Sequence, residues 1–189
     1  YKEKNIKNFM IIAPNLTIYN KLIRDFGDTS YEKYVFKGIN EFYLANIITG
    51  DNYKRNIEGQ ISYSNININI FNISKINAET KGGKEPQIKR LSEYIGDSYF
   101  NYLANLKDLV ILMDESHHYR ADRGMQVLNE LNPVLGLELT ATPQIEKGNK
   151  TIKFKNVVYE YSLAKAMRDG YVKIPYVATK KNFNVDNYK

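Results

Sequence analysis

Hydrophobic residues along the chain occur in short strand-like runs that alternate with stretches of helical spacing. In the stretch 16–26, for example, apolar side chains recur every three or four residues, whereas isoleucines alternate with asparagines in 66–73. The pattern predicts strands at 9–13, 41–49, 66–73, 109–113 and 135–139, and helices at 16–26, 88–95, 99–106 and 125–131. Residues 44–48 alone would also suit a helix. This alternation, with buried parallel-type strands, is typical of a three-layer α/β domain.

The most informative run is residues 109–113, five apolar residues followed directly by Asp114-Glu115-Ser116-His117. Such a run is typical of a central parallel strand, and the carboxyl ends of parallel strands are where open α/β sheets bind ligands. One of two adjacent carboxylates can hold the water shell of a magnesium ion while the other orients or deprotonates an attacking water. We therefore assign Asp114 to the metal and Glu115 to the water. The alternative is that the pair caps the helix that follows.

A second strand, residues 135–139, ends in the hydroxyl-bearing sequence Thr140-Ala141-Thr142-Pro143. Taken alone, this sequence would be an ordinary turn or helix cap. His117 and His118 do not predict a zinc site, because zinc needs three or four ligands and the chain has two histidines and no cysteine. A solvated loop position is the alternative for either histidine.

These residues carry a family resemblance. Asp114-Glu115-Ser116-His117 resembles the DExH box of superfamily 2 helicases, and residues 140–143 resemble their motif III. The longer run 114–121 is similar to the helicase subunit of type III restriction enzymes. Residues 10–16 resemble motif Ia, and residues 161–171 resemble the segment that leads into a second motor domain, although by pattern alone this segment is an amphipathic helix ending at glycine.

The resemblance implies a RecA-like P-loop NTPase fold that uses ATP and Mg²⁺ and moves on DNA. It implies a modification (methyltransferase) subunit as the partner in the intact complex. By the same resemblance, Glu115 and His117 are catalytic, Asp114 and Glu115 bind the nucleotide, and Asp114 binds magnesium. The resemblance assigns coupling to DNA to Thr140, Ala141 and Thr142, and contact with the DNA backbone to Pro14 and Asn15.

The phosphate loop that such motors need is missing from the chain. The nearest candidate, Lys81-Gly82-Gly83-Lys84, has Ala78 where the first glycine belongs and Glu85 after the lysine, so residues 81–86 are expected to form a solvated loop. We therefore expect an incomplete first motor domain at 1–155 and a segment leading toward a second at 156–189, inactive alone. The alternatives are a non-catalytic nucleic-acid-binding or scaffolding module with the same fold, or another superfamily 2 helicase.

Composition adds little to this interpretation. The net charge of +6 and the pI near 9.2 suit a polyanionic partner, but the lysines are scattered along the sequence, as on an ordinary solvated surface. The chain has no cysteine, no long apolar span and no signal-peptide pattern. We therefore expect a cytoplasmic protein without a disulfide framework or membrane contact.

Overall fold

The computed structural model of the chain describes residues 3–39, 45–53, 66–73, 98–118, 123–147 and 150–173. The predicted helix at 88–95 and the predicted loop at 81–86 lie outside these residues. The chain divides into two compact units between Lys153 and Phe154, and each is treated by itself below. No helix in the described part of the chain is long and apolar enough to cross a membrane.

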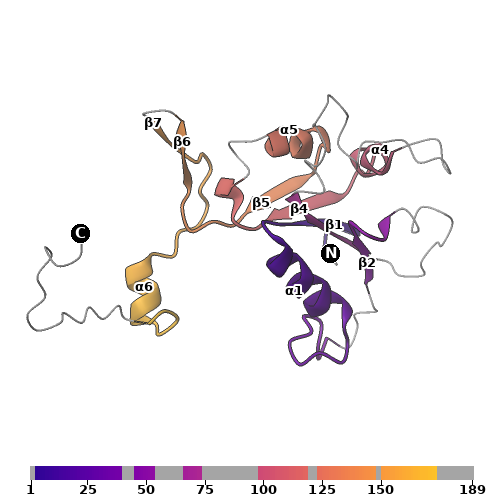
Figure 1. Ribbon diagram of the computed structural model, residues 1–189, viewed down its shortest axis with the longest axis horizontal. Coiled ribbons are helices and arrows are strands. Elements are labelled where there is room, and N and C mark those ends of the chain that lie inside the picture. Colours follow the sequence, from indigo (N-terminus) through magenta and orange to yellow (C-terminus); the bar gives the residue numbers. More distant parts are fainter. Residues whose placement is uncertain are drawn as a thin grey trace, which may run out of the picture. The chain divides into compact units, whose positions relative to one another are not determined.

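A five-stranded parallel sheet forms the centre of the first unit (Figure 1). Every neighbouring pair of strands runs in parallel, as predicted for an α/β domain. The strands, in their order across the sheet, are β2 (Asn46–Thr49), β3 (Asn67–Asn72), β1 (Asn8–Ala13), β4 (Leu109–Met113) and β5 (Leu135–Glu138).

Helices cover both faces of this sheet, so the predicted three layers are present. In Figure 1, α1 (Leu16–Gly27) lies on one side of the sheet, and α4 (Tyr99–Ala104) and α5 (Arg123–Glu130) lie on the other. Side chains of β1 pack in the apolar clusters on both faces of the sheet, because successive side chains of a strand point to opposite faces. Met10 and Ile12 belong to the apolar cluster that includes α4 and α5, whereas Ile11 belongs to the cluster that includes α1.

A ladder of side-chain amides crosses the amino ends of the strands. Asn46 Nδ2 donates to Asn67 Oδ1 at 3.2 Å, and Asn67 Nδ2 donates to Asn8 Oδ1 at 3.0 Å. Asn8 Nδ2 in turn donates to Asp108 Oδ1 at 2.7 Å, directly before β4. A one-residue slip of any strand would break this ladder as well as exchange its buried and exposed faces, so the ladder helps to fix the register.

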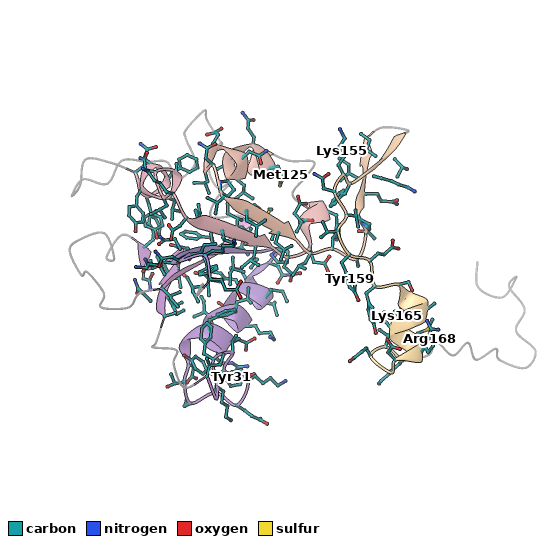
Figure 2. All side chains as sticks on the ribbon, turned by 180° about the vertical axis from the view of Figure 1, so that it is seen from behind. Tyr31, Met125, Lys155, Tyr159, Lys165 and Arg168 are labelled. Carbon is teal, nitrogen blue, oxygen red and sulfur yellow. The ribbon has the colours of Figure 1, made fainter. Side chains whose placement is uncertain are left out.

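A hairpin and a helix after β5 complete the described structure. Strands β6 (Gln144–Lys147) and β7 (Lys150–Lys153) form an antiparallel hairpin, which the apolar pattern did not predict. In the second unit, α6 (Leu163–Arg168) lies within the segment predicted to be helical; Figure 2 labels Lys165 and Arg168 on it. The Ser162 hydroxyl accepts a hydrogen bond from Lys165 N at the start of α6. Gly170, with φ of 78°, supplies the left-handed backbone conformation after its end.

Candidate functional site

The predicted site residues meet at the carboxyl edge of the sheet. Ile12 of β1, Met113 of β4 and Glu138 of β5 lie in one row across three neighbouring strands. The residues that follow these strands, among them Pro14, Asp114 and Thr140, therefore leave the sheet at the same edge. This is the edge where parallel sheets bind ligands.

Backbone hydrogen bonds from both neighbouring strands hold the turn after β4. Asp114 N donates to Ile12 O at 3.3 Å, which ties the turn to β1. On the other side, Leu139 N donates to Met113 O at 2.8 Å and Ser116 N donates to Leu139 O at 3.1 Å. The turn continues as a short 3-10 helix, η2 (Ser116–His118), whereas α5 begins only at Arg123. The acidic pair is therefore not the N-cap of that α-helix.

Glu115 has an uncommon backbone conformation, with φ of 49°. A non-glycine residue in this left-handed region costs on the order of 1–3 kcal/mol, and such residues cluster at functional sites. Its Oε2 is buried, has no hydrogen-bond partner and lies 3.3 Å from His117 Nδ1. The Glu115 side chain as a whole is 41% exposed. The carboxylate thus combines a sheltered oxygen atom with access from solvent.

His117 and Thr140 join the two turns at this edge. His117 Nδ1 lies 2.7 Å from Thr140 Oγ1, and this hydroxyl oxygen also accepts a hydrogen bond from Thr142 N at 3.1 Å. The hydroxyl lies 3.2 Å from Thr142 O, to which it can donate. If the hydroxyl donates to Thr142 O, His117 Nδ1 must carry the proton that it shares with Thr140. Ala141, between the two threonines, is exposed.

Ser116 is the site residue that the sequence did not single out. Its side chain is fully buried and its Oγ has no hydrogen-bond partner. A buried hydroxyl without a partner is uncommon in proteins, and this one lies between Glu115 and His117, the two residues predicted to be catalytic. The one available signal was its position between Glu115 and His117, which does not by itself predict burial.

Asn15, predicted to contact DNA, has a structural role in this chain. Its Oδ1 accepts a hydrogen bond from Ile18 N at 2.9 Å, so it is the N-cap of α1. Asn15 is exposed and Pro14 is half-buried, both next to the carboxyl end of β1. Contact of either residue with DNA stays a prediction.

The acidic pair has the donor chemistry that Mg²⁺ prefers. Mg²⁺ in nucleotide sites is held by one or two carboxylates together with phosphate oxygens and water. Asp114 is half-buried at the carboxyl edge, and its Oδ1 accepts a hydrogen bond from Glu115 N at 3.0 Å. Among the described side chains no group of three or more histidines and carboxylates could hold a metal ion. A cation here would therefore need oxygen ligands from a nucleotide and from water.

Comparison with known proteins supports one family. No curated protein matches the chain. A family model described as the type III restriction enzyme, res subunit, matches residues 1–145 of the 189, a range that includes every predicted site residue. Members of this family are helicase-like, nucleotide-binding subunits that act on DNA, and the domain has a RecA-like fold, in agreement with the parallel sheet. The chain therefore belongs to the type III restriction enzyme res subunit family.

Proposed function

We propose that the chain is part of the ATP-dependent motor with which a type III restriction enzyme moves along DNA. The observation that carries this proposal is the 2.7 Å contact between His117 Nδ1 and Thr140 Oγ1. This contact joins an acidic turn suited to nucleotide hydrolysis to the adjacent turn after β5. A motor needs such a link, because hydrolysis must change the grip on DNA.

In this proposal the two carboxylates divide the chemistry. Asp114 holds Mg²⁺ through its water shell, and the bound ion would neutralise the charge of the nucleotide phosphates. Glu115 orients an attacking water and accepts its proton. The 41% exposure of the Glu115 side chain supports this role, because it gives a water molecule access to the carboxylate. Both carboxylates also belong to the nucleotide site.

His117 would report the state of the nucleotide site to the turn after β5. Its Nδ1 contacts both Glu115 Oε2 at 3.3 Å and Thr140 Oγ1 at 2.7 Å. A change in the charge or position of Glu115 therefore acts directly on the hydrogen bonds of Thr140 and Thr142. We assign these threonines, with Ala141 between them, to coupling, and Pro14 and Asn15 to the DNA backbone.

We also propose that this motor domain is incomplete. Leu135, Leu137 and Leu139 are 54%, 39% and 53% exposed, although parallel strands are normally covered on both faces. Leu137 lies in register with Leu112, which packs in the cluster that includes α1. Leu135 and Leu137 therefore lie on the α1 face of β5, which is the edge strand, and Leu139 directly follows this strand.

The handedness of parallel connections indicates what would cover them. Helix α1 connects β1 to β2, and this crossover leads away from β4 and β5 on the α1 face. If a further strand lay beyond β5 and a helix connected it to β1, this connection would run across the sheet in the same direction, from β5 toward β2. Because such crossovers are right-handed, its helix must lie on the α1 face, where the leucines are exposed. We propose that this strand and helix carry the phosphate loop, which the 189 residues lack.

The remaining parts of the proposal follow from the family. A type III restriction enzyme acts with a modification (methyltransferase) subunit, which we propose as the partner of the intact protein in the cytoplasm. Residues 156–189 would lead toward the second motor domain. The 189-residue chain would then be inactive alone, for lack of a phosphate loop and a second motor domain.

The test compares the 189-residue chain with a form extended upstream of Tyr1. The chain should show no ATPase activity above background, with or without DNA, whereas the extended form together with the downstream motor domain should hydrolyse ATP. Leu137→Asp should lower the melting temperature of the extended form far more than that of the chain. Val35→Asp is the matched control, since Val35 is 46% exposed and lies in the segment after α1, not on β5.

Three outcomes would contradict this account in whole or in part. Robust ATPase activity of the highly purified chain would show that it is not incomplete. An extended form without a phosphate loop and without ATPase activity would favour the rival, a non-catalytic nucleic-acid-binding or scaffolding module. Activity of another superfamily 2 type, without any association with a modification subunit, would contradict the type III assignment alone.

A further inference from the structure

The hairpin of β6 and β7 has no part in the function proposed above. It forms a separate two-stranded sheet, with Ile145 paired to Ile152 and Gln144 paired to Lys153. Ile152 is 46% exposed. A lone two-stranded hairpin is marginally stable in water, so a hairpin of this kind gains stability from a partner.

Positive charge dominates this hairpin. Residues 144–153 contain three lysines and a single acidic residue, Glu146. The strand register pairs the backbone of Lys147 with that of Lys150. This excess of positive charge makes a polyanion the complementary partner of the hairpin.

Hydrogen bonds connect the hairpin to the functional site. Gln144 N, in the first residue of β6, donates to Thr142 O at 2.7 Å. Thr142 N donates to Thr140 Oγ1, which lies 2.7 Å from His117 Nδ1. Hydrogen bonds thus lead from Gln144 through Thr142 and Thr140 to His117. His117 Nδ1 lies 3.3 Å from Oε2 of Glu115, the carboxylate proposed to activate water.

We propose that this hairpin binds the phosphate backbone of duplex DNA. A two-stranded ribbon fits the major groove of B-DNA, and lysines along it can neutralise phosphates. This proposal rests on the proposed function for one point only, the identity of the polyanionic partner as DNA. It adds a DNA contact separate from Pro14 and Asn15, attached to the turn that couples hydrolysis to movement.

The test measures binding of the intact protein to a mixed-sequence DNA duplex over a range of salt concentrations. Each phosphate contact contributes about 0.9 to the slope of log K against log salt, so Lys147→Gln with Lys150→Gln should reduce the slope by up to about 1.8. Replacing the same two residues by arginine keeps the charge and should keep the slope. The matched control is Lys33→Gln with Lys37→Gln, two exposed lysines in the segment after α1.

An unchanged slope in the hairpin variant, or an equal loss in the control, would overturn the proposal. If the double variant fails to fold, Lys153→Gln alone should reduce the slope by about 0.9, and its failure to do so would overturn the proposal equally. Failure here is distinguishable from failure of the proposed function. A protein that hydrolyses ATP in response to DNA with an unchanged hairpin slope would keep the motor and lose only this contact.

Discussion

Replacing Asn69 by leucine should destabilise the sheet through the hydrogen bond that it leaves unmade. Asn69 is 1% exposed in the middle of β3, and its Nδ2 donates to Phe9 O at 3.0 Å. The Tyr99 hydroxyl, in a side chain only 2% exposed, donates to Asn69 Oδ1. This pair connects the central sheet to α4 inside an otherwise apolar cluster.

The magnitude follows from burial. A buried donor or acceptor left without a partner costs about 1–3 kcal/mol, whereas replacing both partners by apolar groups of similar shape is nearly neutral. Asn69→Leu strands the Tyr99 hydroxyl, and Tyr99→Phe strands the Asn69 oxygen. Each single variant should lose about 2 kcal/mol of unfolding free energy. The loss in the double variant should be smaller than the sum of the two single losses by about 2 kcal/mol.

The assay is denaturant unfolding of the wild type, both single variants and the double variant. Asn129→Leu, at an exposed position of α5, should change the unfolding free energy by no more than about 0.5 kcal/mol. Strictly additive losses in the cycle would refute the reasoning, because they would show that the two side chains do not share a buried hydrogen bond. An Asn69→Leu variant with the unfolding free energy of the wild type would refute the reasoning as well.

Three further predictions concern pH, metal and coupling. Burial raises the pKa of the Tyr99 hydroxyl well above its ordinary value, so the folded state keeps a proton that the unfolded state loses; stability should therefore fall as pH rises above about 10, and Tyr99→Phe should reduce that fall in pH-dependent unfolding. Asp114→Asn in the full-length protein should raise the Mg²⁺ concentration needed for ATPase activity, and excess Mg²⁺ should partly restore the rate; a rate that does not depend on Mg²⁺ in this way would contradict the assignment. Thr140→Ala with Thr142→Ala should retain more ATPase activity than DNA translocation when the two are measured side by side, and equal loss of both would argue against coupling.

Apolar periodicity was sufficient to predict most of the sheet. Each of its five strands contains at least two isoleucine or leucine residues, and the parallel arrangement followed from the alternation of strands with helices. Strand β2, predicted at 41–49, is described only for Asn46–Thr49. The acidic pair could be placed at the carboxyl edge because a strand end determines which edge its next residue occupies.

Features that depend on tertiary contacts were missed. The asparagines of β3 appear as polar positions in the sequence, yet Asn69 is buried because Tyr99 and Phe9 satisfy its amide. The hairpin of β6 and β7 has few apolar residues and therefore little periodic signal. The capping role of Asn15 is readable from sequence, since asparagine before a helix is a common N-cap, but the family resemblance directed attention to DNA instead.

The most direct test of the central claim is the ATPase rate of the full-length protein carrying Glu115→Gln. This substitution keeps the size of the side chain and removes the base. Nucleotide binding should be retained while hydrolysis falls by roughly 10²- to 10⁴-fold, and Glu32→Gln, at an exposed position after α1, should leave the rate unchanged. Hydrolysis at the wild-type rate by the Glu115→Gln protein would show that the acidic pair has only a structural role and would contradict the proposed mechanism.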